Sequence, residues 1–141
     1  MTYTKNIKIY SYNSEEQNSN FYSIIGKYFA FREYAKEMGG WQFYNKDNSV
    51  WFLLYVDDIL AGFCCMFVEN THIFYDNFYI FKEYRNKGLS KILFDYRLKE
   101  CKKYNKEIRA IVENPIQDKN YIRNNFEYYG NRGHYKKWRL L

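Results

Sequence analysis

The chain has 141 residues, of which 47% are hydrophobic and 23% are aromatic, and its formal net charge is +6. This length predicts one domain, residues 1–141, that buries about two thirds of the surface of the unfolded chain. A mean hydropathy of -0.68 with no long uncharged apolar run excludes a membrane-spanning helix, and no apolar signal-peptide block opens the sequence, so we expect a cytoplasmic protein without membrane partners.

Cysteine and histidine residues do not show the pattern of a metal site. Cys64 and Cys65 are adjacent in an apolar run, Cys101 lies in a helical segment, and His72 and His134 each stand apart from other ligand types. Metal sites need such ligands at short, fixed spacings, so we expect no metal. The cysteine usage also agrees with a reducing compartment.

Charge is distributed unevenly along the chain. Residues 1–70 hold 6 Lys and Arg against 8 Asp and Glu, a net charge of -2, whereas residues 71–141 hold 16 against 8, a net charge of +8. The positive charge of the second half therefore predicts that this half binds a polyanion, such as coenzyme A or a nucleic acid. We favour coenzyme A, because aromatic residues and lysine are enriched along the whole chain and not in one stretch typical of nucleic-acid binding.

The first third of the chain predicts a strand followed by helix. Ile7–Tyr12 alternates as a strand does, and Ser14–Gln17 reads as a capping box. Apolar residues then follow helical spacing over residues 21–38, as one bent helix or two short ones, up to a stop at Gly39-Gly40. Residues 41–44 fit a short strand or a loop on the substrate side, followed by a turn.

Three consecutive strands are predicted in the middle of the chain. Val50–Val56 and Ile59–Val68 form a hairpin around Asp57-Asp58, and a turn at Glu69–Thr71 leads into the strand His72–Phe81. The later elements are then a helix from Leu89, a strand Glu107–Glu113, a helix with Asn114 as N-cap and Pro115 at its first position, and closing strands Phe126–Tyr129 and His134–Leu140 around Gly130 and Gly133.

The turn between the third of these strands and the next helix carries Arg85-x-x-Gly88-x-Ser90. A helix that begins near Gly88 directs its unpaired N–H groups and the positive end of its dipole at the turn. Gly88 has no Cβ to keep an anion from the backbone, and Arg85 and Lys87 add positive charge. The sequence therefore predicts a phosphate-binding corner here.

Two motifs resemble the GNAT superfamily of acyl-CoA-dependent N-acetyltransferases. The first family motif is Arg/Gln-x-x-Gly-x-Gly/Ala after a strand that ends in Val-x-Pro. In this sequence Ile80 stands for the Val, Lys82 for the Pro, and Ser90 for the final Gly or Ala of the motif. The second is Asn-x-x-Ala-x-x-x-Tyr-x-x-x-Gly-Phe over residues 114–126, where Tyr121 is in register. Gln117 and Asn125 replace the Ala and Gly of that motif, and Asn114 and Phe126 match.

The resemblance covers nearly the whole chain and implies its fold. The predicted order β, α-α, β-β-β, α, β, α, β-β is that of the family, an α/β (α+β) single domain. The implied sheet is mixed and mostly antiparallel, with splayed fourth and fifth strands, and is flanked by helices.

The resemblance also implies acetyl-CoA as cosubstrate. Backbone groups of Phe78 and Ile80 would hold the pantetheine arm in the gap between the splayed strands, and Asn114 and Asn120 would contact it. The N–H groups of the following residues would hold the pyrophosphate: Arg85, Asn86, Lys87, Gly88, Leu89, Ser90 and Lys91.

Three residues are candidates for the chemistry. Tyr121 matches the family's donor to the departing thiolate. Asp76 is the first candidate base for the acceptor amine, since period-2 alternation places it on the strand face of Phe78 and Ile80, and Glu113 is the second. Several relatives carry a catalytic Glu at the position that Phe74 occupies here. Because Phe74 has no carboxylate, it cannot act as that base.

The sequence thus predicts an N-acetyltransferase that transfers an acetyl group from acetyl-CoA to a primary amine within a ternary complex. The acceptor stays open among a protein, a small molecule and a nucleic-acid-linked amine, and the chain fits a monomer or a homodimer. One alternative is a CoA-binding regulatory module without turnover, suggested by Phe74, Ser90 and Gln117. Another is a protein that acts on tRNA or on bases.

Overall fold

The structure, a computed structural model, describes residues 6–37, 43–112 and 115–141. Predictions on Gly39-Gly40, Trp41, Glu113 and Asn114 lie outside these residues. The strands are β1 (Ile7–Tyr12), β2 (Ser49–Val56), β3 (Ile59–Val68), β4 (His72–Ile80), β5 (Glu107–Val112), β6 (Glu127–Arg132) and β7 (Tyr135–Leu140). The helices are α1 (Ser19–Ala30), α2 (Arg32–Glu37), α3 (Leu89–Cys101) and α4 (Pro115–Arg123), with short 3₁₀ turns η1 (Ser14–Glu16), η2 (Lys82–Tyr84) and η3 (Lys102–Tyr104).

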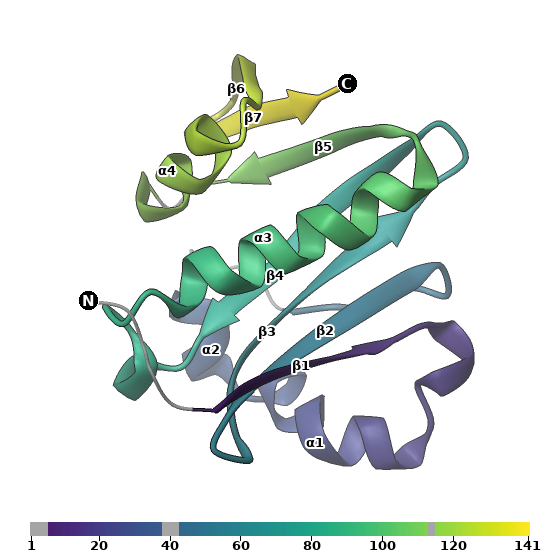
Figure 1. Cartoon of the computed structure of the whole chain (residues 1–141), viewed down its shortest axis with the longest axis vertical. Helices are drawn as coiled ribbons and strands as arrows, with labels where there is room; N and C mark the ends of the chain where they lie inside the picture. The colour runs from purple at the N-terminus through teal and green to yellow at the C-terminus, as the bar shows by residue number, and fades with distance from the viewer. Residues whose placement is uncertain (1–5, 38–42, 113–114) are drawn as a thin grey trace.

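The seven strands form one sheet in the order β1-β2-β3-β4-β5-β7-β6. Every neighbouring pair is antiparallel except β4 and β5, which run parallel. The parallel pair is joined only from His72↔Glu107 to Tyr75↔Ala110, and the two strands diverge beyond it (Figure 1). The predicted α/β fold, a mixed and mostly antiparallel sheet with splayed fourth and fifth strands, is confirmed.

Each face of the sheet has its own hydrophobic core. The α3 side is packed with β2, β3 and β4 side chains together with Leu93, Phe94 and Tyr121 from the helices. The α1 and α2 side is mostly aromatic, with Phe21, Trp51, Phe63 and other rings. Because a strand alternates its side chains between faces, these two cores show where each β4 residue points.

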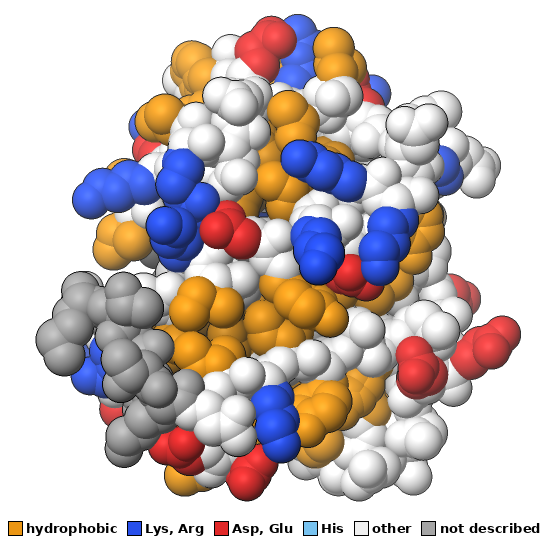
Figure 2. Space-filling view, in the orientation of Figure 1, with side chains coloured by type: hydrophobic (Ala, Val, Ile, Leu, Met, Phe, Trp, Pro, Cys, Tyr) orange, Lys and Arg blue, Asp and Glu red, His pale blue; other side chains and the backbone are white. Residues whose placement is uncertain are grey.

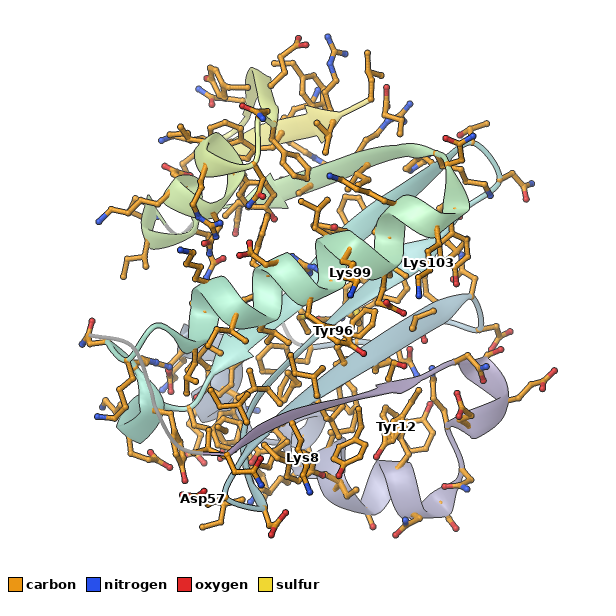
Figure 3. All side chains as sticks on the ribbon, viewed as in Figure 1. Lys8, Tyr12, Asp57, Tyr96, Lys99 and Lys103 are labelled. Carbon is orange, nitrogen blue, oxygen red and sulfur yellow. The ribbon has the colours of Figure 1, made fainter. Side chains whose placement is uncertain are left out.

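Helix α3 lies along one face of the sheet (Figure 1). Tyr96 points from it toward β2, where its ring meets that of Phe52 at 5.9 Å between centroids, and Lys99 and Lys103 are exposed on the outer surface (Figure 3). Figure 2 shows Lys and Arg side chains gathered over α3 and the elements above it in that view. The helix therefore has an apolar face toward the sheet and a lysine-bearing face toward the outside.

Helix starts in the first third differ from the prediction in detail. The capping box belongs to Asn13 and Glu16 around η1, one position before the predicted one, and Asn18 caps α1. The helical stretch is two helices, because Phe31 leaves the helical conformation (φ -89°, ψ 127°) between α1 and α2. In the described residues, no helix has the length and apolar character needed to cross a membrane.

Turn residues explain the β2–β3 and β6–β7 hairpins. Asp57 and Asp58 have φ values of 49° and 67°, the left-handed pair that a tight two-residue hairpin turn needs. In the last hairpin the predicted strand end at Tyr129 is wrong, since β6 continues to Arg132 and the register shifts between Tyr128 and Asn131. Gly133 (φ 64°) makes the turn.

Candidate active site

A β-bulge interrupts β4 at the point where β5 leaves it. Phe63 of β3 faces Tyr79, but Cys65 faces Asp76, so β4 holds one residue more than β3 over this stretch. Asn77 takes up the extra length with a left-handed φ of 53°, a conformation that asparagine tolerates better than most residues.

The bulge reverses which face the β4 side chains occupy. Before it, Phe74 packs into the aromatic core under α1 and α2; after it, Phe78 and Ile80 pack into the α3 core. Asp76 lies before the bulge, and its carboxylate accepts from the hydroxyl of Tyr44 on the α1 and α2 side. The prediction that Asp76 shares a face with Phe78 and Ile80 is therefore wrong, because the extra residue breaks the period of two.

Asn77 fixes the bulge to the segment that precedes β2. Its side chain is 2% exposed, and its Nδ2 donates to the carbonyl of Tyr44 at 2.8 Å and to the Cys65 sulfur at 3.0 Å. The N–H of Tyr44 donates back to Asn77 Oδ1 at 3.4 Å. Sequence analysis missed this residue, for which the signal was an asparagine inside an apolar strand.

Beyond Tyr75, the open edge of β4 faces the wedge between β4 and β5. Phe81 donates its N–H to Ala61 of β3 at 2.9 Å, so alternation turns the backbone groups of Ile80, and of Phe78 two residues earlier, to the opposite edge. The Ile80 carbonyl there accepts from Arg85 Nε at 2.8 Å. The structure thus places both predicted backbone contacts on the wedge side.

The loop before α3 presents backbone donors. Asn86 and Gly88 have left-handed φ values of 63° and 81°, and Gly88 is the N-cap of α3 without any side-chain cap. Among the described residues, no acceptor is recorded for the amides from Asn86 to Lys91. Successive free N–H groups at a helix start form a concave anion site, which is the predicted phosphate corner.

Side-chain charge at this corner comes from lysines and not from Arg85. The Arg85 guanidinium turns back to Glu37, with 2.6 Å between Nη2 and Oε2, and lies over the Tyr79 ring at 5.4 Å. Lys87 is half-buried and Lys91 is exposed, and no ion pair is recorded for either among the described residues. The pairing of Arg85 with Glu37 joins the corner to α2.

Ser90 and Asn120 connect α3 to α4 across the wedge. The Ser90 hydroxyl accepts from Asn120 Nδ2 at 3.1 Å and from Gln117 Nε2 at 3.4 Å. Asn120 is 7% exposed, and its Oδ1 accepts from Arg123 at 2.9 Å. Leu89, in contrast, is buried in the α3 core, so only its amide is available to a ligand.

Tyr121, on α4, is buried close to the last residue pair that joins β4 to β5, because Trp138 beneath its ring pairs with Ala110 of that rung. Its ring stacks on Trp138 at 5.6 Å and meets the edges of Phe94 and Phe126. Burial raises the pKa of the Tyr121 hydroxyl to about 12, although the neighbouring Arg97 guanidinium lowers it. At neutral pH this hydroxyl is therefore protonated and can donate a hydrogen bond.

Arg97 is the buried cation of the site, and sequence analysis missed it. It is 1% exposed, and its guanidinium stacks on the Tyr75 ring at 3.7 Å. Its Nη1 donates to the carbonyls of Cys65 at 3.1 Å and Asp76 at 3.4 Å, which lie at the bulge. The signal was a basic residue four positions after Leu93, on the apolar face of α3.

Asp76 has the surroundings of a tuned carboxyl. Burial raises its pKa, while hydrogen bonds from the Tyr44 hydroxyl and from the Asn77 N–H, at 2.8 Å from Oδ1, oppose that rise. Tyr44 stacks on Phe67 at 5.1 Å, which fixes the ring beside the carboxylate. In the parts of the chain that are described, no three His, Cys, Asp or Glu side chains gather as metal ligands would.

Two open cavities lie outside the wedge. One of about 260 Å³ is bordered by β1, β2 and the end of α3, and includes Phe52 and Lys103. The other, of about 440 Å³, is polar and includes Tyr22, Asn45 and Lys46. Neither includes the bulge or the loop before α3, whose features point to a ligand that enters the wedge along backbone groups.

The bulge, the diverging strands and the uncapped start of α3 define an α/β protein with a strand–loop–helix corner of the kind that binds phosphate groups. The family model described as acetyltransferase (GNAT) family matches residues 13–124. The chain therefore belongs to the GNAT family, as the two motifs predicted. Comparison with curated protein sequences gave no significant match.

Several solved structures share the fold. ElaA of Escherichia coli aligns with a TM-score of 0.76 at 13% identity, over 96% of this chain and 100% of that one. The PaiA N-acetyltransferase of Thermoplasma acidophilum, in complex with coenzyme A, gives 0.69 at 17%, over 95% and 98%. The ribosomal-protein-S18-alanine N-acetyltransferase of Escherichia coli gives 0.64 at 16%, over 95% and 91%.

Proposed function

We propose that the protein is an N-acetyltransferase that transfers the acetyl group of acetyl-CoA to a primary amine within a ternary complex. The observation that carries the proposal is the uncapped loop from Asn86 to Lys91 next to strands that part after Tyr75. Family membership and the coenzyme A complex of the Thermoplasma acidophilum PaiA protein support acetyl-CoA as the ligand.

In this proposal the loop amides bind the pyrophosphate, and the pantetheine arm lies along the open edge of β4. The wedge-facing backbone groups of Phe78 and Ile80 pair with the arm. An N–H near Ile80 faces the thioester oxygen, and one such donor to a developing oxyanion typically contributes about 10²–10³ in rate. Asn120 already bonds Ser90, so it borders the arm as part of the α3–α4 connection.

Asp76 is the proposed base for the acceptor. An amine with a pKa near 10.4 needs about 4–5 kcal/mol to be neutral at pH 7, so a carboxylate that takes its proton lowers the barrier. Burial raises the pKa of Asp76, which makes its carboxylate a stronger base than an exposed one. The acceptor then approaches from the α1 and α2 face, where Tyr44 meets this carboxylate. Glu113, outside the described residues, stays the second candidate.

Tyr121 is the proposed hydrogen-bond donor to the departing sulfur. Its pKa of about 12 lies above the value near 8.5 of a free thiol, so complete proton transfer to the thiolate is uphill by about 5 kcal/mol. Tyr121 therefore stabilises the sulfur anion by donating a hydrogen bond, and the thiolate leaves as an anion or takes its proton from water.

The proposal treats residues 1–141 as one catalytic domain that works in the cytoplasm, as a monomer or a homodimer, on an acceptor that is still unidentified. An amine acceptor agrees with the named activity of the Escherichia coli ribosomal-protein-S18-alanine N-acetyltransferase, which shares the fold. A nucleic-acid-linked amine stays a less favoured acceptor.

Two measurements test the proposal. Calorimetry with acetyl-CoA tests ligand binding, and a lack of affinity at millimolar ligand would exclude the proposed acetyltransferase activity. Release of free CoA thiol in the presence of a panel of primary amines then tests turnover. Binding without release from any amine would favour the alternative, a CoA-binding module without catalysis, for which the acid-free position Phe74 is the motivating observation.

A further inference from the structure

Arg97 is a buried charge whose hydrogen-bonding groups are only partly used. Nη1 donates to two carbonyls at the bulge, whereas Nε and Nη2 have no acceptor among the described residues. Within the described part of the chain no carboxylate forms an ion pair with it, and the guanidinium is covered by the rings of Tyr75, Phe78 and Phe94. A buried cation with unmatched donors is a site for an anion.

The groups around the guanidinium are neutral at physiological pH. On β3, burial raises the pKa of Cys64 to about 11 and that of Cys65 further. Cys101 on α3 also has a pKa raised to about 11, and burial raises that of Tyr75 on β4 well above its usual value. Among the described acids, Asp76 acts on this region, and it directs its carboxylate to Tyr44 on the opposite face.

Tyr121 links this cation to the wedge. Its hydroxyl interacts with the Arg97 guanidinium, and it is the group assigned above as donor to the departing sulfur. A sulfur that reaches Tyr121 from the wedge therefore comes within the field of a positive charge that forms no ion pair with any described carboxylate.

We propose that Arg97 stabilises the CoA thiolate that forms when the acetyl group is transferred. The inference rests on the proposed function. The amine nitrogen forms a bond to the carbonyl carbon, the C–S bond breaks, and its electron pair stays on sulfur. The amine proton goes to Asp76, and the sulfur anion is held by the Tyr121 hydroxyl, with the positive charge of Arg97 beside that hydroxyl.

The test uses the product complex, so that it needs no known acceptor. The thiol of CoA bound to the whole protein is titrated by the ultraviolet absorbance of the thiolate, and desulfo-CoA, which lacks the sulfur, provides the baseline. An opposite charge nearby lowers a pKa by about 1–3 units, so we expect the bound thiol to titrate about one unit or more below the free thiol. The protein's own cysteines do not interfere, because burial raises their pKa values.

Two variants separate charge from packing. Arg97→Met keeps an apolar side chain of similar length and should return the bound thiol to its free pKa, while desulfo-CoA binds with unchanged affinity. Arg97→Lys keeps the charge and should retain part of the shift. With any amine that supports turnover, Arg97→Met should lower kcat and leave KM for acetyl-CoA nearly unchanged.

The outcomes distinguish this inference from the proposed function. If neither CoA nor desulfo-CoA binds the wild-type protein, both fail. If both bind but the wild-type thiol titrates as it does in water, only the role of Arg97 is overturned, and this holds even if Arg97→Met does not fold. A shift that persists in Arg97→Met would overturn it as well.

Discussion

The first half of β4, His72–Tyr75, is paired with a strand on each side, whereas the second half, Asp76–Ile80, is paired with β3 alone. Both halves bury their alternate side chains, so hydrophobicity does not distinguish them. They differ in how the backbone is used. The first half pairs its N–H and C=O groups inside the sheet, whereas among the described residues one edge of the second half has no strand partner and only its Asp76 and Ile80 carbonyls accept from arginine side chains.

The comparison shows how one strand supports both stability and a site. The paired half holds β5 in the sheet, and the segment formed by α4, β6 and β7 is attached through β5. The bulge at Asn77 then turns Asp76 to one face and the open backbone to the wedge. Substitutions in the open half and around it should therefore alter ligand binding or rate, and matched substitutions elsewhere should not.

The largest expected effect is on the anion corner. Gly88→Glu places a Cβ at a left-handed φ of 81° and a negative charge at the proposed pyrophosphate site, so we expect CoA affinity to fall by more than about 100-fold, or about 3 kcal/mol. Gly133→Glu makes the same change at a φ of 64° in the last hairpin turn and should leave affinity intact. If calorimetry gave equal CoA affinities for both variants, we would conclude that the ligand does not bind at the loop before α3.

The next effect concerns two tyrosines that both contact Arg97. Tyr121→Phe removes the proposed donor to sulfur, so kcat should fall by about 10- to 100-fold with KM for acetyl-CoA little changed. Tyr75→Phe removes a buried hydroxyl beside Cys101 in the paired half of β4 and should leave kcat unchanged. A similar loss in both variants would show that packing around Arg97, and not the donor, sets the rate.

A smaller effect is expected from the base. Because burial raises the pKa of Asp76, this carboxylate becomes protonated at a higher pH than an exposed aspartate does. The rate should therefore fall as the pH drops through the raised pKa of Asp76. Asp76→Asn should lower kcat at neutral pH and abolish this acid limb. His72→Gln is the control, since His72 also titrates in the acid range, with a pKa lowered by burial. An acid limb that survives in Asp76→Asn would exclude Asp76 as the base.

The smallest effect is on the connection between α3 and α4. Ser90→Ala removes the acceptor for Asn120 and Gln117, which corresponds to about 1 kcal/mol or less of stability and about a twofold loss in CoA affinity. Ser23→Ala, which removes a hydroxyl bonded within α1, should leave CoA affinity unchanged. Thermal unfolding with and without CoA measures both quantities, and a loss above tenfold would give Ser90 a direct ligand contact.

Much of the fold was accessible from local patterns. Alternation found the strands, the two aspartates at 57 and 58 marked their hairpin, and Pro115 marked the start of α4. The two motifs placed the phosphate corner and Tyr121. The face of Asp76 was mispredicted, since one inserted residue at Asn77 inverts the alternation. Arg97 was missed because its position on the apolar face of α3, although a signal, does not by itself show that a basic residue is buried.

The sequence by itself determined the elements, their order and the uncapped glycine corner, because these depend on backbone preferences and on spacing between residues close along the chain. Only the tertiary structure decided that Arg85 pairs with Glu37, that Asp76 faces Tyr44, and that Arg97 lies beneath the bulge beside Tyr121. These contacts join residues that are 21 to 48 positions apart or lie on different elements. They depend on strand register and on which helix covers which face, and neither is set by any single segment.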